Sequence, residues 1–192
     1  PDDVTVTNTD NETAGITVNP TTGLVTTENG GSASFSMVLN TEPTSDVTID
    51  MLSSDENEGT VAPASLTFTS ATWDAPQTVT VSGVDDDIDD GNQSYTIHTA
   101  SAVSDDLNYH GLDASDVQAT TIDNDIAGVT VSPTSGLSTS EGGNSDTFSI
   151  VLDSEPTGEV TITLVSSDDT EARVDPTYIT FDSTNWDTHQ MV

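Results

Sequence analysis

The chain has 192 residues, and its 34 acidic side chains against a single basic one, Arg173, give a formal net charge of −33 at pH 7. This balance excludes a nucleic-acid-binding surface, which needs Lys and Arg against phosphates, and docking on an anionic membrane. Cysteine and lysine are both absent, which excludes disulfides and Lys–Asn isopeptide crosslinks. No stretch has the length and apolar character of a membrane helix or the charged start of a signal peptide, so we expect no direct membrane insertion; such segments, if they exist, lie outside this sequence.

An internal repeat with an offset of 113 residues organises the sequence. Trp186 follows Trp73 at this offset, and Phe181 follows Phe68 in the same way. From positions 3 and 116 to positions 79 and 192 the copies align without a gap, and about half of the aligned residues are identical. We therefore divide the chain into the C-terminal tail of a preceding repeat (1–13), a complete repeat (14–126) and the N-terminal part of a next repeat (127–192). The sequence does not say whether this last part is ordered.

Alternating apolar runs, separated by turn residues, predict seven strands in the complete repeat. No run has a helical period and adequate length. A repeat of this size matches one β-sandwich domain, so the predicted fold class is all-β, with tandem seven-stranded antiparallel immunoglobulin-like sandwiches. Pro63 makes the fourth run irregular, as in a bent or edge strand. The seven runs are residues 15–19, 33–40, 47–53, 60–68, 77–81, 94–99 and 116–122.

Residues 84–91 (VDDDIDDG) place five carboxylates within six positions. At an extended spacing of about 3.3 Å per residue, several of these charges lie within about 7 Å of one another. Each such pair repels by about 2–3 kcal/mol at an effective dielectric near 20. No Lys or Arg is nearby, so this loop is either splayed into water or holds a cation.

The order of the strands brings other acidic groups to the same place. If the strands run alternately up and down, the first, third and fifth connections and the exit from the last strand lie at one end of the domain. Carboxylate oxygens without His or Cys suit Ca²⁺, which takes about six to eight oxygen ligands, whereas Mg²⁺ prefers to keep its waters. The sequence therefore predicts a Ca²⁺ site at this pole, near Glu28, Asp55 with Glu56 and Glu58, the run from Asp85 to Asp90, and Asp123 with Asp125.

Residues 84–90 and the end of the repeat at 119–128 (ATTIDNDIAG) resemble the Calx-β domain family. That family is known from the regulatory loop of sodium/calcium exchangers and from tandem arrays in large bacterial surface proteins. The resemblance covers the whole chain once the repeat is counted, and it implies a seven-stranded sandwich that binds Ca²⁺ in its distal loops. The metal ligands that it implies are Glu28, Asp55, Asp85, Asp86, Asp87, the backbone carbonyl of Ile88, Asp90, Asp123 and Asp125.

The chain departs from the family pattern at three points. The loop after residue 53 is shorter than in the exchanger domain, so Asp55 is favoured as the ligand there, with Glu56 or Glu58 as substitutes. The acidic run fades into Gly-Asn-Gln at 91–93, and Asn124 stands in the terminal acidic triplet, so fewer or weaker ions are expected. We predict one complete site near the joint of the two repeats and two half-sites, one at Asp10 and Glu12 and the other at Glu141 and Asp168.

These features predict a Ca²⁺-binding structural spacer of a large secreted or cell-surface protein of adhesin type. Its partners would be neighbouring repeats of the same chain, and a host or biofilm ligand, if there is one, would bind elsewhere in the parent protein. Two alternatives stay open: an adhesive module that binds a glycan or a protein through loop 100–115, and a Ca²⁺-sensing regulatory domain. An enzyme is not expected, because no nucleophile elbow or oxyanion-hole signature accompanies the Ser and Asp residues.

Two further features favour structural roles. Trp73 and Trp186 occupy the same place in both repeats, which favours packing against the domain over stacking on a sugar. In loop 100–115, an EF-hand count from Asp106 places Gly111 at position six but Val117 at position twelve, where a Glu is required. This loop is therefore expected to form a structured turn.

Overall fold

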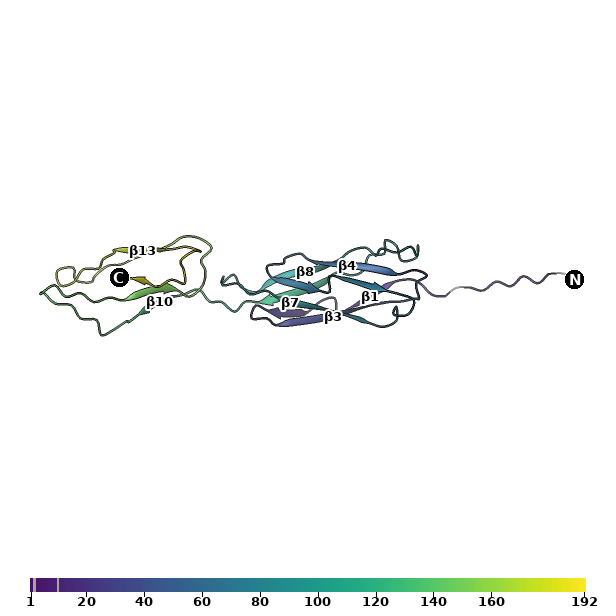
Figure 1. Cartoon of the computed structure of the whole chain (residues 1–192), viewed down its shortest axis with the longest axis horizontal. Helices are drawn as coiled ribbons and strands as arrows, with labels where there is room; N and C mark the ends of the chain where they lie inside the picture. The colour runs from purple at the N-terminus through teal and green to yellow at the C-terminus, as the bar shows by residue number, and fades with distance from the viewer. Residues whose placement is uncertain (2, 10) are drawn as a thin grey trace. The chain divides into compact units, whose positions relative to one another are not determined.

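The computed structural model describes residues 1, 3–9 and 11–192, and every regular element in them is a β-strand. The strands form two compact units, β1–β9 and β10–β14 (Figure 1). The all-β class predicted from the sequence is confirmed. Among these residues, no helix has the length and apolar character needed to cross a lipid bilayer.

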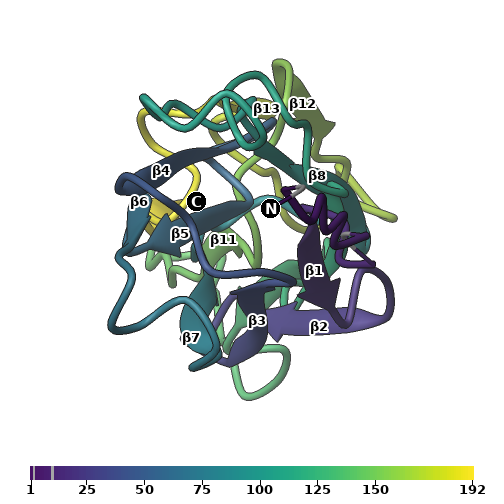
Figure 2. The ribbon, with the colours of Figure 1, turned by 90° about the vertical axis from the view of Figure 1, so that its right-hand side faces the viewer.

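Two sheets form the first unit. One has the order β1-β3-β7-β5, and the other has the order β2-β9-β8-β4-β6. Figure 2 shows β1, β3 and β7 on one side of the unit and β4 and β8 on the other. The bounds are β1 Ile16–Asn19, β2 Leu24–Thr27, β3 Ser32–Leu39, β4 Val47–Ser53, β5 Gly59–Ala62, β6 Ser65–Phe68, β7 Gln77–Gly83, β8 Gln93–Thr99 and β9 Val117–Ile122.

A single core lies between these sheets because the strands alternate inward apolar and outward polar residues. In β3 the inward residues include Phe35 and Met37, and in β4 they include Val47 and Ile49. Each fully buried side chain of this size stabilises the fold by about 2 kcal/mol through removal of apolar area from water. Trp73 packs against the same core, which confirms the packing interpretation.

The described residues of the first unit form nine strands where the sequence pattern predicted seven, so that count was wrong. The predicted run 60–68 divides at Pro63 into β5 and β6, which belong to different sheets. Proline lacks the N–H that a continuous ladder would use, and the chain changes sheets at this point. The other additional strand, β2, has only four residues and pairs in parallel with β9. Leu24 is its one buried apolar residue, which gives too short a pattern to be recognised.

The second unit is smaller and contains two short sheets, β10-β11-β14 and β12-β13. Its core consists of Ile150, Leu152, Ile179 and Phe181, with Trp186 packed against it. Fewer strands form here than in the first unit, and the sequence given ends at Val192, before any counterpart of β8 and β9. The bounds are β10 Val129–Ser132, β11 Ser149–Leu152, β12 Val160–Thr163, β13 Tyr178–Phe181 and β14 Gln190–Met191.

Candidate metal centre

The parallel pairing of β2 with β9 brings two acidic segments together. Thr27 lies opposite Ile122 in this pair, so the residues that follow the two strands leave the sheet at the same end. The Glu28 amide continues the pairing by donating to the Ile122 carbonyl at 3.2 Å. Glu28 and Asp123, which are far apart in the sequence, are therefore neighbours because of strand pairing.

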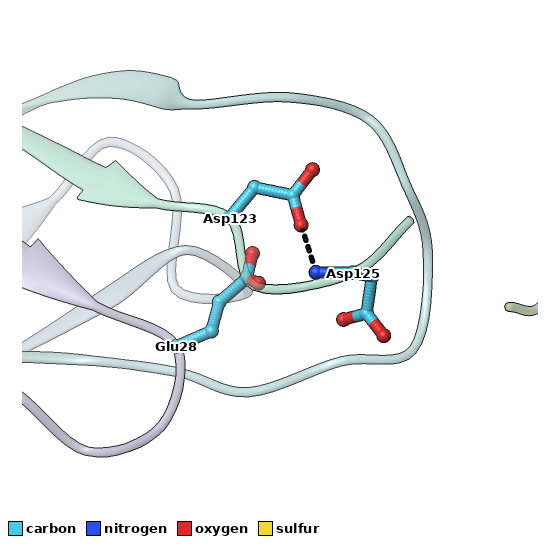
Figure 3. A group of neighbouring side chains, drawn as sticks. All are labelled: Glu28, Asp123 and Asp125. Carbon is cyan, nitrogen blue, oxygen red and sulfur yellow. Dashed lines mark hydrogen bonds between the residues drawn. The ribbon is translucent and has the colours of Figure 1, made fainter. Parts of the chain in front are cut away.

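Three carboxylates meet at this end. Glu28, Asp123 and Asp125 each offer one oxygen, and these oxygens lie within 4.8 Å of one another. It is the one such group of three or more potential metal ligands among the residues that the structure describes. Figure 3 shows the Glu28 carboxylate beside Asp123 and Asp125, with the Asp125 amide donating to Asp123 Oδ1 at 2.6 Å. The turn made by this bond orients both aspartates.

Burial makes this arrangement costly without a cation. The Glu28 side chain is only 2% exposed, and Asp123 and Asp125 are half-buried. Two unit charges 4.8 Å apart repel by about 3 kcal/mol at an effective dielectric near 20. The only Lys or Arg of the chain is Arg173, which lies in the second repeat. Residues 1–126, which include all three carboxylates, therefore contain no Lys or Arg that could balance this repulsion.

The donor set fits a hard divalent cation. Oxygens on opposite sides of a Ca²⁺ ion with Ca–O distances of about 2.3–2.6 Å are about 5 Å apart, and the three oxygens satisfy that limit. If Ca²⁺ binds here, it supplies the positive charge that the carboxylates lack. Glu28, Asp123 and Asp125 would hold it, and neighbouring loop oxygens would fill its remaining positions.

The acidic loop 84–91 is folded by its own hydrogen bonds. Asp86 Oδ1 accepts from the Ile88 amide at 2.8 Å, and the Gly91 amide donates to Asp123 Oδ2 at 2.7 Å. Asp89 Oδ2, which was not among the predicted ligands, accepts from the Ala127 amide at 2.7 Å. The loop is thus ordered around Asp123. Its carboxylates Asp85, Asp86, Asp87 and Asp90 are outside the three-residue group.

In the loop after β4, the buried acid is Glu58 and not Asp55. Asp55 is exposed and its Oδ1 accepts from the Asn57 amide at 3.0 Å, so this carboxylate shapes its own turn. Glu58 is 8% exposed, and its carbonyl accepts from the Val84 amide at 3.1 Å and from Thr121 Oγ1 at 2.8 Å. Since β7 and β9 end beside Glu58, we favour Glu58 over Asp55 as the acid that this loop contributes to the pole.

A chain of buried hydroxyls lies behind the pole, and the sequence pattern did not reveal it. Thr121 donates its single hydrogen to the Glu58 carbonyl, so Thr26 is the donor in the 2.9 Å bond between Thr26 and Thr121. Tyr95 in turn donates to Thr26 at 3.1 Å. All three side chains are buried. The one available signal was threonine at inward strand positions, where apolar residues are the rule.

The predicted half-sites are less complete. Glu141 and Asp168 are both exposed, and Asp168 Oδ1 accepts from the Thr170 amide and hydroxyl at 3.1 and 2.6 Å. These bonds from Thr170 hold the pKa of Asp168 below its usual value. Glu12 is exposed, and Asp10 lies outside the described residues. Neither pair belongs to a group of three ligands within the described part of the chain.

Solved structures of Calx domains are among the structural neighbours. The apo form of the Calx CBD1 domain is 16% identical, with a TM-score of 0.44 over 59% of this chain and 100% of that chain. CBD12 from CALX1.2 is 12% identical, with a TM-score of 0.43 over 92% of this chain and 72% of that chain. SSP-19, an MSP-domain protein like family member in Caenorhabditis elegans, is 17% identical, with a TM-score of 0.36 over 56% of this chain and 97% of that chain. No protein-family model and no curated protein matches the chain. Values this low do not assign the chain to a family.

Two buried side chains of loop 100–115, the candidate recognition surface, form hydrogen bonds to the segment 41–44 of the same unit. Asp106 Oδ2 accepts from the Thr44 amide at 2.8 Å, and its Oδ1 accepts from the Asn108 amide at 2.9 Å. Tyr109 is buried, and its hydroxyl donates to the Thr41 carbonyl at 2.6 Å. The expected structured turn is confirmed, and it differs from an EF-hand because Asp106 binds backbone amides.

Asp106 gives the fold a specific acid sensitivity. Hydrogen bonds from the Thr44 and Asn108 amides hold its pKa below the usual value. Because the pKa is lowered in the folded state, this contribution to stability is present above the ordinary aspartate pKa of about 3.9 and is lost as pH falls through the lower folded value. We expect Asp106→Asn to lower the thermal midpoint at pH 7, as measured by circular dichroism. Between about pH 4 and pH 2 the midpoint of this variant should fall less than the midpoint of the wild type.

The matched control is Asp105→Asn, which removes the same charge from an exposed neighbour. It should leave both the midpoint at pH 7 and the acid profile close to those of the wild type. Equal acid profiles for the wild type and Asp106→Asn would show that the two amide bonds do not contribute.

Proposed function

We propose that this chain is a Ca²⁺-binding spacer from a tandem array in a large secreted or cell-surface protein of adhesin type. The observation that carries the proposal is the group of Glu28, Asp123 and Asp125, in which a buried carboxylate meets two others within 4.8 Å. The resemblance of residues 84–90 and 119–128 to the Calx-β family supports the same ion. In this proposal each complete repeat is an immunoglobulin-like sandwich with Ca²⁺ at one pole.

Ca²⁺ would offset part of the negative charge at this pole and hold the acidic loop against the ends of the strands. The acidic loop lies close enough to complete the coordination, since the Gly91 amide already donates to Asp123. Carboxylates from Asp85, Asp86, Asp87 and Asp90 and the carbonyl of Ile88 are available in that loop. One bound ion would offset two of the negative charges at the pole and link the ends of β2, β7 and β9.

The spacer role rests on the repeat and on the position of the ligands within it. Asp123 and Asp125 directly precede residue 127, where the next repeat begins by the 113-residue offset. An ion held by these residues would restrict bending at the joint, and neighbouring repeats would be the partners of each unit. Copies that align without a gap favour a spacer over a recognition module, because a spacer gains length from repetition and a single binding site does not.

Calorimetric titration with CaCl₂ tests the binding, and small-angle scattering with and without Ca²⁺ tests the spacer role. We expect a saturable heat with one dominant site, and a larger radius of gyration with a narrower distribution of distances in Ca²⁺. No heat at millimolar Ca²⁺ would refute the metal site. Binding without a change in scattering would refute the stiffening.

A further inference from the structure

The turn between β2 and β3 contains the only asparagine of the chain that is followed by glycine. Asn29 precedes Gly30, whereas every other asparagine precedes a residue that carries a Cβ. Asn29 is exposed, and Gly30 has a φ of +90° with nothing within 4 Å of the position of a Cβ. Glycine allows a close approach of its backbone to a neighbouring group. The backbone nitrogen of Gly30 therefore has steric access to the side-chain amide of Asn29.

The hydroxyl of Thr27 donates to this side chain. Thr27 Oγ1 donates to Asn29 Oδ1 at 2.7 Å and accepts from the Gly31 amide at 3.0 Å. A hydroxyl has a single hydrogen, so these two bonds fix the direction in which it donates. Thr27 ends β2 and lies opposite Ile122 of β9, and this pairing holds its backbone in place. A hydrogen-bond donor is thus aimed at the carbonyl oxygen of Asn29.

Such a donor activates the side-chain carbonyl toward a nucleophile. When a nucleophile adds to Cγ of Asn29, negative charge develops on Oδ1, and a donor that is already in place stabilises that charge. The Gly30 nitrogen is the next backbone atom beyond the Asn29 carbonyl group, so nucleophile and target belong to the same molecule and need no encounter. The turn therefore combines an accessible nucleophile with a positioned donor for the developing charge.

Two hydrogen bonds restrain the nucleophile. The Gly30 amide donates to the Thr27 carbonyl at 3.1 Å and to the Glu28 carbonyl at 2.7 Å. The nitrogen must leave both carbonyls before it attacks, so the reaction starts from local openings of the turn. Exposed turns open at a lower free-energy cost than paired strands. Since Thr27 belongs to a paired strand, its hydroxyl keeps its place during these openings.

We propose that Asn29 is a site of intramolecular deamidation, promoted by the Thr27 hydroxyl. The Gly30 nitrogen gives its proton to a solvent base and bonds to Cγ of Asn29, and the side-chain nitrogen leaves as ammonia. Water then adds to the resulting cyclic succinimide and opens it at either carbonyl. One opening gives aspartate, and the other gives isoaspartate, in which the main chain runs through the former side chain. Water is the one co-reactant that is consumed.

Both products change the residue next to Glu28. Aspartate adds a negative charge to the turn, and isoaspartate adds a methylene to the backbone as well. Glu28 belongs to the candidate metal centre, so the reaction would alter the surroundings of that centre as the protein ages. The reaction itself needs no metal, and it stands or falls separately from the proposed function.

Incubation of the full ¹⁵N-labelled chain in chelator at mildly alkaline pH tests the proposal. Nuclear magnetic resonance follows the side-chain NH₂ signal of each asparagine over time, and mass spectrometry counts the amide-to-acid conversions. We expect the Asn29 signal to disappear first, while the signal of Asn144 persists. Asn144 is an exposed internal control, because residues 141–144 (EGGN) contain the same residue types as residues 28–31 (ENGG) but place Ser145 after the asparagine.

Two variants test the role of Thr27. Thr27→Val removes the donor and should slow the loss of the Asn29 signal roughly two- to tenfold, as expected for one hydrogen bond. Thr27→Ser keeps a hydroxyl and should retain the wild-type rate. The wild-type time course decides the site even if Thr27→Val does not fold. An Asn29 signal that persists as long as that of Asn144 overturns the deamidation site, and equal or faster conversion in folded Thr27→Val overturns the role of the hydroxyl.

Discussion

Glu28→Gln is expected to lower the thermal midpoint in saturating Ca²⁺ and to raise it in chelator. The substitution keeps the size of a side chain that is 2% exposed, but removes one of three charges within 4.8 Å. Without metal, the loss of repulsion, about 3 kcal/mol per pair at an effective dielectric near 20, stabilises the fold. With metal, the loss of a ligand removes a linkage that is worth about 2.7 kcal/mol at one hundred times the dissociation constant.

A variant that is less stable than the wild type in Ca²⁺ but more stable in chelator would show that Glu28 binds metal. A purely structural role would lower the thermal midpoint in both conditions. The matched control is Glu141→Gln, the same residue at the equivalent position of the second repeat, where the side chain is exposed. Scanning calorimetry of the wild type and both variants, each in CaCl₂ and in chelator, provides the comparison. An equal Ca²⁺-dependent shift in the wild type and Glu28→Gln would exclude Glu28 as a ligand.

The positions of most strands in the first unit could be predicted from the sequence because they follow from simple periodicity. The run 47–53 coincides with β4, and the run 77–81 lies within β7. The parity of the predicted strands placed Glu28, in the first connection, at the same pole as Asp123 and Asp125. In the structure Glu28 directly follows β2, which the pattern did not reveal, and Asp123 directly follows β9. The grouping came from the order of the connections and needed no knowledge of side-chain contacts.

The sequence could not show which acid of the loop after β4 is buried at the pole. Asp55 and Glu58 are three residues apart, and no period distinguishes them. The distinction arises from the Glu58 carbonyl, which accepts from Thr121 and so fixes Glu58 in the interior while Asp55 turns outward. Such a bond joins residues that are 63 positions apart, and only the folded sheet brings them into contact.

Gly83→Ala is expected to destabilise the first unit by about 1–3 kcal/mol, as overpacking in a closed site does. Gly83 ends β7, and its amide donates to the Gly31 carbonyl at 3.1 Å. A Cβ at this position would lie 2.3 Å from the Thr27 carbonyl oxygen and 2.8 Å from its carbon. The obstacle is backbone, so it cannot rotate away, and the end of β2 must shift.

Because Thr27 directly precedes Glu28, the same shift should change the position of the Glu28 carboxylate relative to Asp123 and Asp125. Gly83→Ala should therefore weaken Ca²⁺ binding in calorimetric titration as well as lower the urea midpoint, although residue 83 carries no ligand. Gly158→Ala is the control, since nothing lies within 4 Å of a Cβ there. If Gly83→Ala lost stability while it kept wild-type Ca²⁺ affinity, the position of Glu28 would not depend on the contact between β7 and β2.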